Sequence, residues 1–284
     1  MYPYTFFLGM GGYEIFLTLG ILVVFFTADK MGEKSGFSIP LQRILIVGFT
    51  LAIALGFAGA VLFQAFYNFM ETGVFVINDQ TGMTFYGGLI FGAGTFLAVW
   101  FVGGRYACKD KKEAVKRFHD IADMAGCMIP LAHAFGRIGC AFAGCCHGKS
   151  TLAWYGVRMY TENGWEKVVP VQLFEAVFLF ILFGLLLWWY FARRKQTGNT
   201  FSKIPLLGVY AIVYGVWRFC IEFMRGDSRG ETLVDFLSPS QLIAVIMIIV
   251  GALYIAIRLL KLRAKTAVGA KTETGNAQEN ENKN

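Results

Sequence analysis

Charged side chains occur inside long apolar stretches of this sequence, where they are costly and usually functional. Arg218, Glu222 and Arg225 follow one another at steps of four and three, which predicts that they share one face of a helix. Arg137 and Glu175 lie in two other apolar stretches. We expect these five side chains to converge on one polar cavity.

A guanidinium group can hold a phosphate through two parallel hydrogen bonds. Arg137 has no acidic residue within a helical turn, so it predicts an anionic ligand, and in a membrane a lipid phosphate is the obvious candidate. His133 lies four residues earlier, on the same predicted helix face. Arg218 and Glu222 allow two interpretations: they orient each other at a binding site, or they only neutralise each other to lower the cost of insertion.

Thiols are concentrated just after Arg137, between residues 136 and 149. Cys140, Cys145, Cys146 and His147 are ligand types that suit a soft metal ion. Adjacent Cys-Cys-His is poor geometry for one tetrahedral ion, and no CxxC pair is present, so we expect no metal site. For Cys145 and Cys146 a disulfide and a reactive thiol remain alternatives, and we expect simple packing of small side chains.

Long apolar helices must position these groups. Of the 284 residues 56% are hydrophobic and only 16% are charged, whereas about a quarter are charged in soluble domains. This excludes an ordinary soluble enzyme, a disordered protein and a disulfide-rich secreted module. The net charge of +7 does not indicate nucleic acid, because Lys and Arg lie in short tracts between apolar stretches. At about 20 residues per span, seven stretches can cross a bilayer: 5–27, 43–69, 84–104, 121–144, 171–192, 204–224 and 237–260.

The charge of the connections alternates, and this predicts an orientation. Connections one, three and five and the C-terminal segment are basic, whereas the second and sixth are acidic. The positive-inside rule then places the N-terminus outside and the C-terminus in the cytoplasm. We expect an all-α integral membrane protein with seven transmembrane helices, a membrane domain at 1–263 and a disordered cytoplasmic tail at 264–284. Glycines inside spans, such as Gly87, Gly88, Gly92 and Gly94, are expected to serve helix packing.

Five motifs occur in the order that is found in one known family. Residues 82–90 are similar to a Phe-His-Gly-Gly-Leu stretch, 136–139 to Gly-Arg-Ile-Gly, and 170–175 to Pro-x-Gln-Leu-Tyr-Glu. Residues 214–225 match Tyr-Gly-x-x-Arg-Phe-x-x-Glu-Phe-x-Arg, and 237–241 are similar to Leu-Ser-x-x-Gln. On these motifs the chain resembles the prolipoprotein diacylglyceryl transferases, over nearly all of its predicted spans.

The resemblance implies a multi-pass enzyme of the bacterial inner membrane. Such enzymes transfer the diacylglyceryl group of phosphatidylglycerol to the lipobox cysteine thiol of prolipoproteins and release glycerol phosphate. The implied partners are phosphatidylglycerol, prolipoproteins and membrane lipid, with no nucleic acid and no cofactor. Two alternatives stay open: a paralogous phospholipid-dependent transferase with a different acceptor, and a non-catalytic lipid-binding membrane protein.

The resemblance also implies roles for single residues. Arg137 and Arg218 would hold the phosphate, and Glu222 would orient Arg218. A base must take the acceptor proton, and because Tyr86 stands where the family has His, the candidates for it are His133 and His147.

Cysteines replace two further residues of the family pattern: Cys140 stands for an Asn and Cys145 for a Glu. The expected catalytic residues are Arg137, Arg218, Glu222, Tyr86, His133 and His147. The expected substrate-binding residues are Gly87, Gly88, Gly136, Gly139, Cys140, Cys145, Gln172, Glu175, Tyr214 and Arg225.

Overall fold

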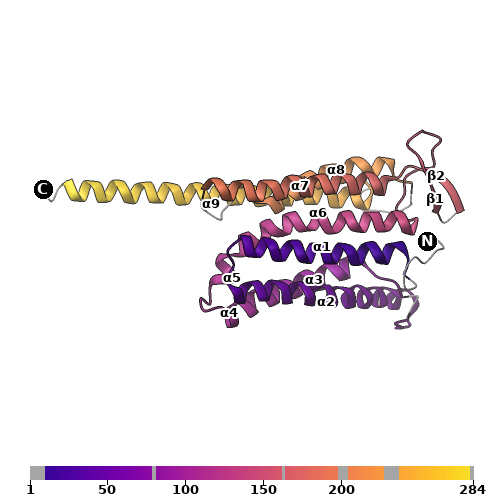
Figure 1. Ribbon diagram of the computed structural model, residues 1–284, viewed down its shortest axis with the longest axis horizontal. Coiled ribbons are helices and arrows are strands. Elements are labelled where there is room, and N and C mark those ends of the chain that lie inside the picture. Colours follow the sequence, from indigo (N-terminus) through magenta and orange to yellow (C-terminus); the bar gives the residue numbers. More distant parts are fainter. Residues whose placement is uncertain (1–9, 79–80, 162–163, 198–203, 227–236, 282–284) are drawn as a thin grey trace. The chain divides into compact units, whose positions relative to one another are not determined.

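A computed structural model describes residues 10–78, 81–161, 164–197, 204–226 and 237–281, with side chains up to Lys261 except those of residues 85 and 193–197. Seven segments of this part are long and apolar enough to cross a membrane (Figure 1). They run over Gly12–Lys34, Ile39–Thr72, Tyr86–Ala107, Phe118–Ala143, Val171–Ala192, Leu206–Met224 and Pro239–Lys261. The expected number of spans and their approximate positions are confirmed.

The order of elements follows the chain with few interruptions. The helices are α1 (Gly12–Lys34), α2 (Ile39–Thr72), α3 (Phe85–Ala98), α4 (Gly104–Ala107), α5 (Glu113–Lys116), α6 (Phe118–Ala143), α7 (Val171–Thr197), α8 (Leu206–Ile221) and α9 (Pro239–Glu281). A π-helical turn, Val99–Gly103, joins α3 to α4, and a 3₁₀ turn, Glu222–Met224, follows α8.

One hairpin corrects the all-α expectation. Strands β1 (Val157–Thr161) and β2 (Gly164–Val168) pair antiparallel, with Val157 opposite Val168 and Tyr160 opposite Trp165. β-Branched and aromatic side chains at these positions favour paired strands. The connection between α6 and α7 therefore carries a small sheet rather than only a loop.

The chain divides into two compact units, of which the second comprises residues 25–118. In this unit α2 and α3 pack through glycine. A Cβ atom on Gly87 would lie 2.6 Å from the Gly59 carbonyl oxygen, and one on Gly92 would lie 3.2 Å from the Ala52 carbonyl oxygen. The packing role expected of Gly87, Gly88 and Gly92 is confirmed, whereas a Cβ on Gly94 would meet no atom within 4 Å.

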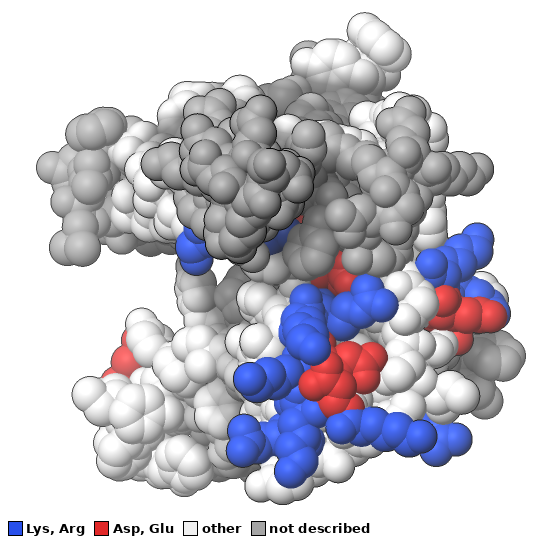
Figure 2. Space-filling view, turned by 90° about the vertical axis from the view of Figure 1, so that its left-hand side faces the viewer, with Lys and Arg blue, Asp and Glu red and all other residues white. Residues whose placement is uncertain are grey.

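Polar contacts fix the basic end of this second unit. Ser38 caps α2 by accepting a hydrogen bond from the Leu41 amide, and its hydroxyl donates to Glu113 of α5 at 3.0 Å. The buried Trp100 indole donates to the Ala114 carbonyl at 3.0 Å. Figure 2 shows Lys and Arg side chains gathered around a few acidic ones at the end of the second unit where α4 and α5 lie. The exposed members in this connection are Arg105, Lys109, Lys111, Lys112 and Lys116.

The first unit comprises residues 1–24 and 119–284 and holds α6 to α9 with the first half of α1. Gly12 and Gly20 of α1 pack on Phe142 and Phe135 of α6, where any added Cβ would overlap the ring carbons. The α8–α9 pair repeats the use of small residues: a Cβ on Gly215 would lie 2.9 Å from the Ala244 carbonyl oxygen. Close backbone approach is what holds helices together in lipid, where apolar surface gains little by pairing.

Two further features concern the ends of helices. The buried Asp123 carboxylate of α6 accepts the backbone N–H of Leu206 at 2.8 Å, so it caps α8 at its first turn. At the same end of the unit, α9 continues to Glu281, beyond the apolar span that ends at Lys261 (Figure 1). The division into a membrane domain at 1–263 and a disordered cytoplasmic tail at 264–284 stays a prediction.

Candidate functional site

Glu175 is the centre of a buried polar network in the first unit. It lies one turn into α7 and is fully buried. The Arg137 guanidinium of α6 reaches both carboxylate oxygens, with Nε 2.8 Å from Oε2 and Nη2 3.2 Å from Oε1. The Tyr214 hydroxyl of α8 donates to Oε1 at 2.8 Å. One carboxylate thus joins three helices by charge and hydrogen bonds.

This network corrects one expectation and confirms another. Arg137 was expected to be unpaired because no acid is near it in sequence, but its partner Glu175 comes from another helix. His133 and Arg137 do share a face of α6, since both approach Glu175, with His133 Nε2 3.8 Å from Oε1. The His133 ring also stands edge-on to the Tyr214 ring, with the centroids 5.1 Å apart. Arg137 can therefore bind an anionic ligand only if its guanidinium divides its contacts between that ligand and Glu175.

A second ion pair lies at the end of α8. Arg218 Nη2 is 2.9 Å from Glu222 Oε2, and the same nitrogen donates to the Ser240 hydroxyl at 2.8 Å. Both side chains are about nine-tenths buried. Arg218 Nη1 is buried with no hydrogen-bond partner among the described residues. Because buried N–H groups are nearly always bonded, this nitrogen is the group best placed to take a ligand oxygen.

The start of α9 supplies residues that the predicted site omitted. Ser238 and Gln241 form a capping box: the Gln241 amide donates to Ser238 Oγ at 3.2 Å, and the Ser238 amide donates to Gln241 Oε1 at 3.0 Å. The Ser238 hydroxyl also donates to Glu222 Oε1 at 2.9 Å. The Ser-Pro-Ser-Gln sequence signals this helix start, with Pro239 at its first position, but nothing in it signals the contact with α8.

Arg225 departs from the predicted helix face. Helix α8 ends at Ile221, the next three residues form a 3₁₀ turn, and Arg225 is extended, with φ −77° and ψ 149°. Its backbone forms an isolated antiparallel bridge with Gly148. The expectation that Arg225 continues the Arg218–Glu222 face is therefore wrong. The buried Arg225 side chain belongs instead to the surroundings of the cysteines.

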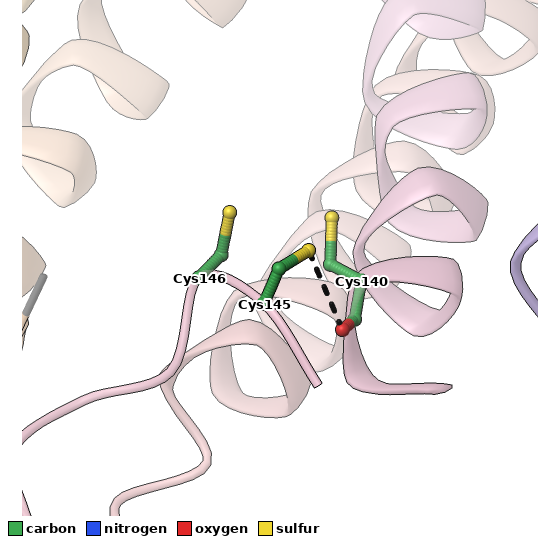
Figure 3. Close-up of side chains that lie close together, drawn as sticks. All are labelled: Cys140, Cys145 and Cys146. Atoms are coloured by element: carbon green, nitrogen blue, oxygen red, sulfur yellow. Dashed lines mark hydrogen bonds between the residues drawn. The ribbon is translucent and has the colours of Figure 1, made fainter. Parts of the chain in front are cut away.

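Cys140, Cys145 and Cys146 form what we call the thiol triad. Their sulfur atoms all lie within 4.8 Å of one another (Figure 3). Cys140 is in the last turn of α6, Gly144 ends the helix with φ 67°, and Cys146 has φ 61°. This left-handed residue, which is rare outside glycine, turns the Cys146 side chain to the same side as that of Cys140 (Figure 3).

The triad overturns the geometric objection to a metal site. That objection assumed that His147 would be a ligand beside two adjacent cysteines, but the third group here is Cys140. His147 Nδ1 lies 2.9 Å from the Gly148 carbonyl oxygen. All six cysteines are free thiols, so the three sulfurs are available as ligands.

Electrostatics distinguish the members of the triad. Hydrogen bonds from the Cys140 and Cys145 thiols, followed by the Arg225 guanidinium, hold the pKa of Cys146 below its ordinary value. Hydrogen bonds with Cys140 and then Cys146, together with burial, raise the pKa of Cys145. Gln172 of α7 is fully buried beside them, and its side-chain amide donates to the Cys145 carbonyl at 3.4 Å. Cys146 is therefore the member that most readily carries a negative charge.

The remaining predicted residues take other places. Tyr86, Gly87 and Gly88 belong to the second unit, whereas the network described above belongs to the first. Gly139 packs against Tyr13, since its Cβ would lie 3.0 Å from the Tyr13 ring. A Cβ on Gly136 would meet no atom within 4 Å, which leaves open space beside Arg137 on α6.

Comparison of the sequence with known proteins points to one family. The sequence profile of the family described as prolipoprotein diacylglyceryl transferase matches residues 4–257. The chain belongs to this family.

Three relatives illustrate how similar the family members are. The phosphatidylglycerol–prolipoprotein diacylglyceryl transferase of Clostridium tetani is 34% identical over 245 residues, which is 84% of this chain and 90% of the relative. The protein of the same name from Nitratidesulfovibrio vulgaris is 30% identical over 200 residues, 69% of each chain. A second transferase of Clostridium perfringens is 36% identical over 159 residues, which cover 54% of this chain and 59% of that relative. These matches confirm the resemblance that the motifs indicated.

Proposed function

We propose that this family member transfers the diacylglyceryl group of phosphatidylglycerol to the lipobox cysteine thiol of prolipoproteins and releases glycerol phosphate. The observation that carries the proposal is Arg218: its Nη1 atom is buried with no hydrogen-bond partner in the described part of the chain, while its other terminal nitrogen is held by Glu222 and Ser240. An arginine fixed on one side with free N–H groups on the other suits a phosphate oxygen. Family membership supports the same substrate.

The reaction breaks a carbon–oxygen bond and leaves negative charge on the phosphate. Arg218 stabilises that charge, and Glu222 holds the guanidinium in place. Arg137 adds a second positive charge on the neighbouring network, balanced by Glu175. His133 remains a candidate base, because its Nε2 faces Glu175, which would stabilise the imidazolium formed when the ring takes a proton.

The proposed orientation follows from the distribution of charge. The basic residues around α4 and α5 favour a cytoplasmic position for this connection. The N-terminus, the hairpin β1–β2 and the thiol triad would then lie on the outer side of a bacterial inner membrane, with the C-terminus in the cytoplasm.

One observation favours a second candidate function. By the resemblance to the family pattern, Cys140 and Cys145 stand where the family has Asn and Glu, and Tyr86 stands where it has His. A paralogous transferase that keeps phosphatidylglycerol but uses another acceptor would show such changes. A non-catalytic lipid-binding protein would keep the arginines without turnover.

Transfer of label from phosphatidylglycerol to a lipobox peptide, by the purified protein in detergent, tests the proposal. We expect the peptide to gain the mass of a diacylglyceryl group. Arg218→Lys should lower the rate by about 100-fold, since it keeps the charge but removes the free N–H groups of the fork. Arg258→Lys, at another buried arginine in α9, is the matched control and should keep the rate.

Three outcomes would oppose the proposal. Phospholipid binding with no transfer to any thiol would identify a binding protein. Transfer to a different acceptor would identify the paralogue. A normal rate in Arg218→Lys would remove Arg218 from the mechanism. Growth of a strain depleted of its own transferase, on expression of this chain, provides the matching test in cells.

A further inference from the structure

We propose that the thiol triad of Cys140, Cys145 and Cys146 binds one thiophilic divalent cation of the zinc class, with a fourth position open for the acceptor thiol. The role of the open position rests on the proposed function, whereas the metal site itself does not. The sulfur atoms lie within 4.8 Å of one another, and zinc–thiolate bonds of about 2.3 Å need only a small further closure.

The backbone brings these three sulfurs together in a specific way. Gly144 ends α6 in the left-handed region, and a Cβ there would collide with the Tyr160 carbonyl oxygen of β1. The chain then returns, so that the Cys145 amide donates to the Cys140 carbonyl at 3.2 Å. Cys146 adopts φ 61°, at a cost of the order of 1 kcal/mol or more for a residue with a side chain. Without this conformation, two adjacent cysteines would not present both thiols to Cys140.

Charges around the triad fit a bound divalent ion. Three thiolates and a divalent cation leave one net negative charge, and the Arg225 guanidinium is hydrogen-bonded to Cys146. Hydrogen bonds to ligating groups hold them in place and tune the metal. Gln172 performs the same task for the backbone of Cys145, through its amide at 3.4 Å from the carbonyl oxygen.

Three protein ligands and a free position are typical of a catalytic zinc site rather than a structural one. Cys145 is exposed, so a ligand can reach the triad from outside. The triad also borders the phosphate-binding residues: Cys140 lies three residues after Arg137 on α6. A thiol bound here would lie next to the arginines that hold the phospholipid.

The cation would replace a general base in the deprotonation of the acceptor thiol. A thiol that coordinates a divalent metal loses its proton, which passes to solvent. The resulting thiolate forms a carbon–sulfur bond with the glyceryl carbon as the carbon–oxygen bond to the phosphate breaks. The glycerol phosphate leaves with the electron pair of that bond, and the metal keeps its oxidation state. This would allow transfer with Tyr86 at the position where the family pattern has histidine.

Titration with Cd²⁺ alone tests the metal site without any substrate. We expect the full-length protein in detergent, reduced beforehand, to bind one equivalent with an ultraviolet sulfur-to-cadmium charge-transfer band. The triple variant Cys140→Ser, Cys145→Ser, Cys146→Ser should lose the band, whereas Cys220→Ser, at an exposed cysteine outside the triad, should keep it. No band in the parent protein, or an equal band in the triple variant, would overturn the site.

Substitution with Co²⁺ tests the open position. Addition of a lipobox peptide should shift the visible cobalt spectrum, and the same peptide with Ser in place of its cysteine should not. An unchanged spectrum with both peptides would overturn the role of the metal in binding the acceptor. Transfer at a normal rate by the triple Ser variant would overturn this inference and leave the proposed function intact. Metal binding without transfer would support the metal site and overturn the proposed function.

Discussion

Arg137 and Glu175 form a two-point ion pair between α6 and α7, with nitrogen–oxygen distances of 2.8 and 3.2 Å. Glu175 is fully buried, and the Arg137 side chain is 11% exposed. A buried charge in this position requires a partner of opposite charge. Removing one partner of a buried pair typically costs about 3–5 kcal/mol, because the other charge stays uncompensated.

Arg137→Ala should therefore destabilise the protein as well as stop transfer. We expect less protein in the membrane and a lower melting temperature in detergent. The double variant Arg137→Met with Glu175→Gln removes both charges and keeps an acceptor for Tyr214, so it should recover accumulation but not activity. Normal stability of Arg137→Ala would show that the pair contributes nothing to the fold.

Reactivity of Cys146 should depend on pH in a specific direction. Its pKa is lowered by the neighbouring thiols and by Arg225, so the thiolate persists at pH values where a free cysteine, with a pKa of about 8.5, is protonated. In the presence of a chelator, the alkylation rate of Cys146 should reach half its maximum at a lower pH than that of a free cysteine in solution. Mass spectrometry of the labelled peptide measures this.

Arg225→Gln provides the control for that pH profile. Removing the guanidinium should move the Cys146 profile towards higher pH, while Cys145, whose pKa is raised, should stay slow throughout. A Cys146 profile that matches the free amino acid in both proteins would contradict the described contacts.

Gly144→Ala should disrupt the link between α6 and the hairpin. The residue has φ 67°, and its Cβ would collide with the Tyr160 carbonyl oxygen. Backbone strain alone costs about 1–3 kcal/mol, and the collision adds to it, so both the melting temperature and cadmium binding should fall. Gly184→Ala in α7 is the matched control, because its Cβ would meet no atom within 4 Å and alanine favours a helix. Equal melting temperatures for the two variants would contradict the geometry at Gly144.

The orientation can be tested with an impermeant thiol reagent on whole cells whose outer barrier has been removed. In a background free of native cysteines, Leu152→Cys should react, because this side chain is 96% exposed in the connection that we place outside. Lys112→Cys, in the basic connection, should react only after the membrane is dissolved. The reverse pattern would overturn both the orientation and the external position of the triad.

Helices were predictable here because their signal is local. Runs of apolar residues predicted the bounds of six spans to within four residues, whereas the first span ends seven residues later than expected, at Lys34. The spacing of His133 and Arg137 predicted their common face. The hairpin β1–β2 was not predicted, since ten residues in a mixed polar connection carry a weak pattern. The capping box at Ser238 was readable from four adjacent residues.

Contacts between segments that are far apart in the sequence could not be predicted from local spacing. Arg137 and Glu175 were expected in one cavity, but their direct ion pair was not predicted, because a spacing rule applies only within one helix. The same rule failed for Arg225, because it assumed that α8 continues past Ile221. The triad was not predicted because it depends on the left-handed backbone conformation of Cys146, which the residue types do not indicate.

The division of the chain into two units implies an order of assembly during synthesis. The second unit, residues 25–118, is contiguous, so it is complete as soon as its last residue leaves the ribosome. Its glycine-lined α2–α3 pair can close at once within the bilayer. Residues 12–24 of α1 are made earlier, yet their partners Phe135 and Phe142 come more than a hundred residues later. The first half of the first span is therefore made early but gains its α6 partners late, and a nascent chain stopped after residue 118 should hold it without the ring contacts of Phe135 and Phe142.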